Sequence, residues 1–226
     1  MRESARHAWR CVLDLFLPRA CARCGREVGA DAALCAPCRG ALPRLAPGLA
    51  PAPPAPLAAW CAEVAYQGEI VDWIQRFKYP ATGLAGLDAR PLALVESLVA
   101  DAAVRVAALR PALVVPVPMH PRRRRARGFH PAGVLARSAG RRLGAPVAFD
   151  ALVAVRETAS QTGLDRSARR RNVRDAFAAR PGFAAPATVA LVDDVATTGA
   201  TLAACARALR RAGARRIVAV CAARKE

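Results

Sequence analysis

The sequence is short of lysine, of acidic residues and of aromatic residues. Two of its 35 basic residues are lysines, Lys78 and Lys225, and 17 acids leave a formal charge of +18. Abundant arginine beside abundant alanine is typical of GC-rich codon usage, but codon usage does not explain the shortage of acids. The charge therefore indicates an anionic partner, such as nucleic acid, a phosphorylated metabolite or an acidic membrane surface. Aromatic side chains make up 5% of the chain, a thin supply for a surface that stacks the bases of a single strand.

A hydrophobic run that could span a membrane is missing too. The longest uncharged stretch, residues 45–62, contains five prolines and is interpreted as a linker or ordered coil. The apolar stretch near the N-terminus is interrupted by Asp14 and has no small-residue cleavage site, which argues against a secretory signal. We therefore expect a cytoplasmic protein with no membrane insertion.

Four of the eight cysteines form two C-x-x-C pairs, Cys21 with Cys24 and Cys35 with Cys38. Tetrahedral zinc takes four soft donors at about 2.3 Å, and two short turns supply them without a large core. A thioredoxin-like redox site needs one such pair at a helix start, so the tandem arrangement favours structural zinc. The three histidines lack ligand spacing. The other cysteines lie in apolar surroundings and are expected in the core, although Cys61 has an alternative place at a metal site: Cys11, Cys61, Cys205 and Cys221.

Apolar periodicity beyond the linker predicts strands that alternate with helices. We expect helices over residues 91–109, 131–143 and 200–212, and strands over residues 112–117, 151–155, 188–192 and 216–222. This alternation predicts an α/β fold with a doubly wound, mainly parallel sheet. We divide the chain into residues 1–62, with the small zinc ribbon and the Pro-rich linker, and residues 63–226, with the sheet domain.

The segment VALVDDVATTGAT, residues 189–201, combines a buried strand, two acids, a loop of small and hydroxyl residues and a helix start. Backbone N–H groups at such a helix start can surround a phosphate. Asp193 and Asp194 would repel that phosphate, so they suit sugar hydroxyls or a hydrated Mg²⁺. The alternative is a chance pair of acids at a helix start. The pattern favours a sugar phosphate, with these loop residues around it: Ala196, Thr197, Thr198, Gly199, Ala200 and Thr201.

The same segment resembles the signature of type I phosphoribosyltransferases, which bind 5-phosphoribosyl 1-diphosphate (PRPP). Together with the zinc ribbon, IQRFKYP, VPVP with an RGF turn, and R-x-T-x-x-Q with RNV, the order of motifs resembles the ComF family of competence proteins, which includes GntX-type members. The resemblance covers the chain from Cys21 to the C-terminus. It departs from the family pattern after RGF, where His130 and Pro131 replace the usual Asn-Gln.

The resemblance implies a protein that binds PRPP and Mg²⁺ and acts with single-stranded DNA in DNA uptake during natural transformation, with a competence helicase or translocase as partner. It implies contacts to the diphosphate or to nucleic acid from Lys78, Arg127, Arg156, Gln161, Arg170 and Arg171. Each basic cluster has a plainer interpretation: a solvated turn for residues 122–127, an exposed helix for residues 166–174, and ordinary surface for Lys78.

The alternative function is an active phosphoribosyltransferase, a glycosyltransferase of nucleotide metabolism. Thr197 stands where enzymes for 6-oxopurines carry an acid, which argues against that substrate. The loop is more similar to that of amidophosphoribosyltransferases, but no glutaminase domain precedes it, so we expect no glutamine-dependent reaction. The sequence assigns no catalytic residue and leaves the acceptor open.

Overall fold

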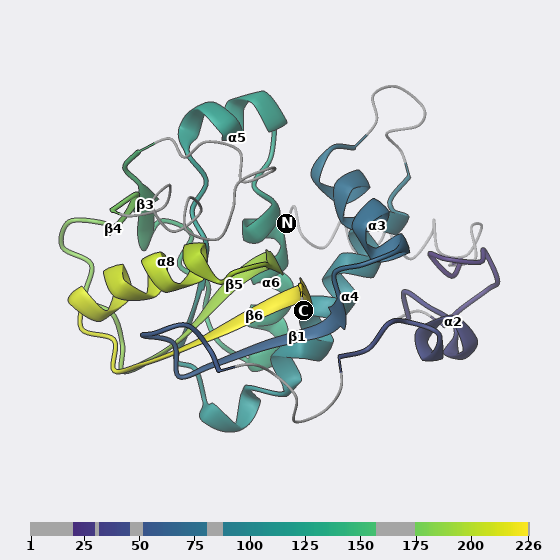
Figure 1. The fold of residues 1–226 in the computed structure, drawn as a ribbon, viewed down its shortest axis with the longest axis horizontal. Coiled ribbons are helices and arrows are strands. Elements are labelled where there is room, and N and C mark those ends of the chain that lie inside the picture. The colour runs from purple at the N-terminus through teal and green to yellow at the C-terminus, as the bar shows by residue number, and fades with distance from the viewer. Residues whose placement is uncertain (1–19, 30–31, 46–51, 81–87, 157–174, 226) are drawn as a thin grey trace, which may run out of the picture.

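A computed structural model describes residues 20–29, 32–45, 52–80, 88–156 and 175–225. Its centre is a four-stranded sheet of order β1-β6-β5-β2, in which all neighbouring strands are parallel. The strands are β1 (Ala59–Ala65), β2 (Leu113–Pro116), β5 (Thr188–Ala196) and β6 (Arg216–Arg224). Figure 1 shows β6, in yellow, between β1 and β5. Nearly continuous apolar runs form β2, β5 and β6, as expected of strands covered on both faces.

Helices cover both faces of this sheet. The helices α3 (Glu69–Lys78), α4 (Arg90–Val104) and α6 (Pro131–Leu143) pack with Val114, Val192 and Val220 into one buried cluster. On the other face α8 (Ala200–Arg211) packs with Val115 and Leu191. Alternate residues of one strand thus face opposite layers, and the predicted doubly wound, mainly parallel sheet is confirmed.

Several predicted elements differ from the observed ones. The predicted helix over residues 91–109 ends earlier, and a short 3₁₀ helix, η2 (Ala107–Leu109), follows α4. The strand predicted near residue 151 is β3 (Leu152–Ala154), but it pairs antiparallel with β4 (Phe177–Ala179) in a separate two-stranded sheet. The helices α3 and α5 (Pro121–Arg127) were not predicted, because both are short and rich in polar residues.

The first sheet strand, β1, lies in the segment interpreted as linker. The prolines of that segment all precede residue 57, so the residues that pair with β6 from Ala59 onward keep their N–H donors. The first four residues of β1, residues 59–62, therefore lie on the linker side of the boundary drawn between residues 62 and 63.

The N-terminal unit, residues 20–29 and 32–45 with α2 (Ala36–Gly40), packs against this sheet and its helices (Figure 1). Its Leu34 and Leu42 belong to the same buried cluster as α4 and α6. Three ion pairs join the unit to α3, α4 and β1: Arg23 with Glu69, Arg39 with Asp101, and Arg44 with Glu63. None of the described helices has the length and apolar character needed to cross a membrane.

Candidate metal centre and ligand cavity

The two C-x-x-C pairs converge at one point of the N-terminal unit. The sulfur atoms of Cys21, Cys24, Cys35 and Cys38 all lie within 4.8 Å of one another, and the Sγ atoms of Cys24 and Cys35 are 3.7 Å apart. In a tetrahedron with zinc–sulfur bonds of about 2.3 Å, the sulfurs are roughly 3.8 Å apart. The four thiols therefore fit one structural zinc ion.

The pKa values of two of these thiols shift in opposite directions. Burial and the neighbouring sulfurs raise the pKa of Cys38 to about 12. At Cys21 burial acts in the same direction, but backbone groups of Cys24, Cys35 and Arg23 outweigh it and lower the pKa to about 6. Four thiolates at this spacing repel one another, so a divalent ion is needed for all of them to ionise together.

A cavity of about 660 Å³ opens at the carboxyl edge of the sheet. All four strands contribute to it at or just after their C-terminal ends, through Tyr66, Val117, Lys225 and the end of β5. The β3-β4 sheet adds a wall with Ala154. This edge is where open α/β sheets bind ligands, and the volume suits a small molecule.

Two adjacent acids lie in this cavity at the end of β5. The backbone N–H of Asp194 donates to Oδ1 of Asp193 at 2.9 Å, and Oδ1 of Asp194 is 2.8 Å from Nζ of Lys78 at the end of α3. Burial and the negative charge of Asp194 raise the pKa of Asp193 to about 8, although Lys78 opposes this rise. At neutral pH the pair therefore holds one proton and one negative charge, which Lys78 neutralises.

The loop between the acids and α8 turns sharply at Gly199. Its φ of +70° is in the left-handed region, and a Cβ there would come within 2.6 Å of Pro54 and 3.1 Å of Trp60. The loop thus passes close against the segment before β1. The twelve-residue helix α8 begins directly after it, and Ala200, Thr201 and Leu202 of its first turn line the cavity.

A buried arginine at the end of β6 lies next to the residues that contact this loop. Arg224, at the end of β6, is 4% exposed and stacks its guanidinium on Trp60 at 5.2 Å from the ring centre. Its Nε–H has no acceptor among the described residues. The next residue, Lys225, donates its backbone N–H to the carbonyl of Ala196 at 2.8 Å. We call residues 196–201 the phosphate-type loop. This loop is therefore hydrogen-bonded to the end of β6, next to the positively charged side chain of Arg224.

His130, where the family pattern has Asn, makes a fixed contact inside the cavity. Its Nε2–H donates to the carbonyl of Val117 at 2.9 Å, and burial lowers its pKa, so the ring is neutral. A Cβ at residue 133 would lie 2.8 Å from Nδ1 of this ring, so Gly133 makes room for it. Pro131 begins α6, at the position where the lost N–H costs nothing.

The short basic helix α5 forms part of the cavity rim. Arg127 donates from Nη2 to the hydroxyl of Tyr79 at 2.7 Å and lies over that ring at 4.5 Å. Tyr79 is 63% exposed, and Arg123 lines the cavity beside Arg127.

The structure brings most of the candidate residues to this one cavity. Those that line it are Lys78, Arg127, Arg156, Asp193, Asp194, Ala196, Thr197, Gly199, Ala200 and Thr201. Thr198 does not line it, and its hydroxyl instead accepts from the N–H of Ala200 at 3.4 Å. Gln161, Arg170 and Arg171 lie outside the described residues. Sequence reasoning did not single out Gln75, Met119 and Phe177, which also line the cavity. Gln75 lies in the IQRFKYP motif, but neither its residue type nor its position marked it as a ligand contact.

Three comparisons relate the chain to known proteins. The family model described as "Double zinc ribbon domain" matches residues 12–51. These residues hold four cysteines and no histidine, enough for one tetrahedral zinc. The expected N-terminal zinc ribbon is therefore confirmed.

Among curated relatives, the chain is 35% identical to Competence protein F of Haemophilus influenzae over 147 residues, covering 64% of this chain and 63% of that protein. It is 30% identical to DNA utilization protein YhgH of Escherichia coli K12 over 223 residues, covering 96% of each.

Among solved structures, a purine phosphoribosyltransferase from Pyrococcus horikoshii matches at 17% identity and a TM-score of 0.38, over 57% of this chain and 71% of that one. Glutamine PRPP amidotransferase from B. subtilis matches at 18% and 0.42, over 64% and 30%. The near full-length similarity to the Escherichia coli protein, with the zinc ribbon at the N-terminus, shows that this chain belongs to the ComF family.

Proposed function

We propose that this protein binds PRPP with Mg²⁺ in the cavity and uses that site in the uptake of single-stranded DNA. The observation that carries the proposal is the arrangement around one cavity of an acid pair at the end of β5, a phosphate-type loop at the start of α8 and a basic rim on α5.

Each part of PRPP has a chemical counterpart in this arrangement. The N–H groups of residues 196–201 suit the 5′-phosphate. The carboxyl groups of Asp193 and Asp194 suit the two ribose hydroxyls, which donate to them. The diphosphate then extends toward the rim, where Arg123 and Arg127 line the cavity.

The same acids fit a magnesium ion, because hard carboxylate and phosphate oxygens are its preferred ligands. When bound, Mg²⁺ would neutralise charge on the diphosphate. The chain's own residues orient the sugar and hold its two charged ends apart.

The proposed role with DNA combines the basic surface with the names of the relatives. Arg122, Arg124 and Arg125 are exposed on α5, next to the cavity rim. One relative is named a competence protein and another a DNA utilization protein. A chain of charge +18 has the electrostatics to hold a phosphate backbone, and a helicase or translocase that delivers the strand is the partner we propose.

Calorimetry of PRPP with Mg²⁺ tests the ligand. We expect binding to the wild-type protein and affinity lowered about 10- to 100-fold in the double variant Asp193→Asn with Asp194→Asn, since the variant loses the negative charge of the pair and with it the charge-assisted hydrogen bonding of the ribose hydroxyls. The matched control is Asp88→Asn, an acid paired with arginines outside the cavity. Equal affinity in the double variant contradicts the assignment, and diphosphate release with candidate bases shows whether transfer occurs.

A salt titration tests the DNA surface. Replacing Arg122, Arg124 and Arg125 by alanine should lower the slope of log affinity against log salt by about two, because each single-strand phosphate contact contributes roughly 0.7. Three exposed arginines of α8 serve as the matched control for lost charge: Arg207, Arg210 and Arg211. A slope that responds equally to both triple variants contradicts a specific role of α5.

A further inference from the structure

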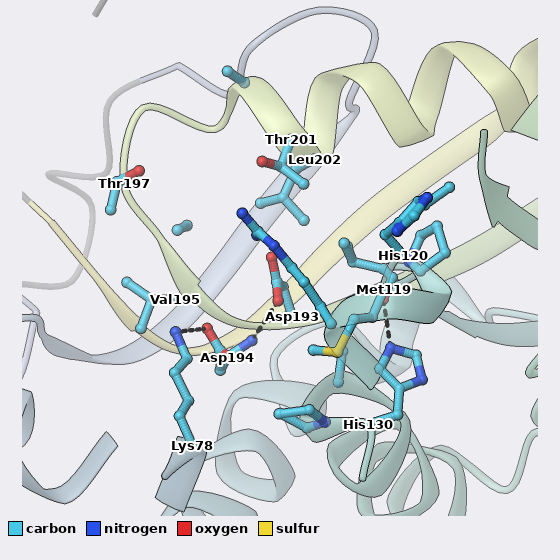
Figure 2. Close-up of a pocket in the computed structure, with 18 of the residues that line it drawn as sticks. Lys78, Met119, His120, His130, Asp193, Asp194, Val195, Thr197, Thr201 and Leu202 are labelled. Atoms are coloured by element: carbon cyan, nitrogen blue, oxygen red, sulfur yellow. Dashed lines mark hydrogen bonds and ion pairs between the residues drawn. The ribbon is translucent and has the colours of Figure 1, made fainter. Parts of the chain in front are cut away.

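Lys78 places an ammonium group inside the cavity, on the side away from the phosphate-type loop. Its Nζ is 2.8 Å from Oδ1 of Asp194, and the two side chains are 21% and 10% exposed. Figure 2 shows the acids between this lysine and Thr201 at the start of α8. The resemblance marked Lys78 as a contact to the diphosphate or to nucleic acid, but its pairing with Asp194 was not predictable, because the two residues are 116 positions apart.

The position of Lys78 is built into the fold. Phe77, just before it, is buried and packs edge-to-face on Phe129 at 5.9 Å. Farther along α3, Ile70 and Ile74 are buried in the core. At its other end, Glu69 pairs with Arg23 of the zinc unit at 2.9 Å. A helix fixed at both ends holds the lysine against the acids, whether or not a ligand is present.

The charge of this lysine matters for an anionic ligand. Two adjacent acids attract sugar hydroxyls but repel phosphate. Burial alone would lower the pKa of Lys78, yet Asp194 and Asp193 raise it, so the ammonium stays charged. Lys78, Asp193 and Asp194 together carry no net charge at neutral pH. Without the lysine, the two acids would carry a negative charge at the place where a diphosphate would approach.

We propose that Lys78 is the specificity-determining residue that lets the acid pair accept a ribose bearing a diphosphate at C1, and so distinguishes PRPP from ribose 5-phosphate. This inference rests on the proposed PRPP site. The 5′-phosphate lies on the loop, on the far side of the acids from Lys78, so its binding depends little on the lysine. The diphosphate leaves the ribose on the side of Lys78 and the α5 rim, where Tyr79, the next residue, already contacts Arg127.

The test compares two ligands in calorimetry with Mg²⁺: PRPP and ribose 5-phosphate. We expect Lys78→Met to weaken PRPP binding about 10- to 100-fold, the scale of a lost charge-assisted contact, and ribose 5-phosphate binding less than about threefold. Lys78→Arg, which keeps the charge, should recover most of the preference for PRPP. Arg76→Met is the matched control, because it removes one positive charge from the same helix outside the cavity, and it should leave the preference unchanged.

The outcomes separate the two proposals. If the wild-type protein binds PRPP and Lys78→Met weakens both ligands equally, Lys78 does not set specificity, while the proposed site stands. If the wild-type protein binds neither ligand, both proposals are wrong. Lys78→Gln, which keeps a donor for Asp194 without the charge, replaces the methionine variant if that variant does not fold, and it should show the same selective loss for PRPP.

Discussion

The Asp193 carboxyl should make the unliganded protein less stable as the pH rises toward 8. Burial and the charge of Asp194 raise its pKa from 3.8 to about 8. Between these values the folded state holds one more proton than the unfolded state. The free energy of unfolding therefore falls by up to about 1.4 kcal/mol per pH unit. The contribution is complete below pH 4 and is lost as the pH passes through the folded pKa.

Between pH 6.5 and 8, the difference between the wild type and Asp193→Asn isolates this effect, because the protons taken up when zinc leaves its thiolates contribute equally to both proteins. His130, whose pKa is lowered by burial from 6.5, acts with the opposite sign and below that window. Over these one and a half units the expected loss is up to about 2 kcal/mol, which corresponds to roughly 4–8 °C in melting temperature for a chain of this size.

Asp193→Asn removes the titration but keeps an oxygen that can accept from the N–H of Asp194. Urea unfolding of the zinc-loaded protein at pH 6.5 and 8.0, without PRPP or Mg²⁺, should show that the wild type loses up to about 2 kcal/mol relative to this variant between the two pH values. Asp88→Asn is the control, because Arg90 lowers the pKa of Asp88. The Asp88 carboxyl therefore titrates below pH 4 and stays ionised throughout this window. Equal losses in the wild type and Asp193→Asn would refute the reasoning.

Three further perturbations test the supporting structure. Cys21→Ser with Cys35→Ser should abolish the binding of one zinc per chain, measured by elemental analysis, and unfold the N-terminal unit, because zinc contributes about 10–16 kcal/mol in comparable peptides. Gly199→Ala should cost about 1–3 kcal/mol in urea unfolding and weaken PRPP binding, since the left-handed backbone is strained and the new methyl would meet Pro54 at 2.6 Å. Glu63→Gln should cost about 1–3 kcal/mol in the same assay, because its buried carboxylate pairs with two arginines that remain partly solvated.

Specific results would contradict each of these expectations. Full zinc content in the double cysteine variant removes the metal centre from the account. For Gly199→Ala, unchanged stability together with unchanged PRPP affinity shows that the loop tolerates a different path. For Glu63→Gln, unchanged stability shows that solvent replaces its ion pairs. A matched exposed change, Asp150→Asn, serves as the comparison for lost surface charge, because Asp150 pairs with Arg180 and its side chain is 65% exposed.

The sequence alone predicted the features that depend on a single continuous segment of the chain. The apolar run before Asp193 predicted β5, and the small residues after it predicted the turn at Gly199 and the start of α8. The cysteine spacing predicted the metal centre because four ligands within 18 residues leave few geometries. These features depend on local order in the chain.

Features that depend on distant partners were not predictable in the same way. Lys78 gains its meaning from Asp194, and β1 forms because β6 offers it a parallel neighbour. The pairing of β3 with β4 gives an antiparallel sheet where alternation predicted a parallel strand. Hydrophobic periodicity predicts which residues of one element are buried, but it does not predict which other elements pack beside that element.

A crystal structure with PRPP and Mg²⁺ tests the central claim most directly. The account predicts the 5′-phosphate against the N–H groups of residues 196–201, and both ribose hydroxyls within hydrogen-bonding distance of Asp193 and Asp194. PRPP bound on another surface, or no ligand in this cavity at a concentration that saturates binding in solution, would contradict the account.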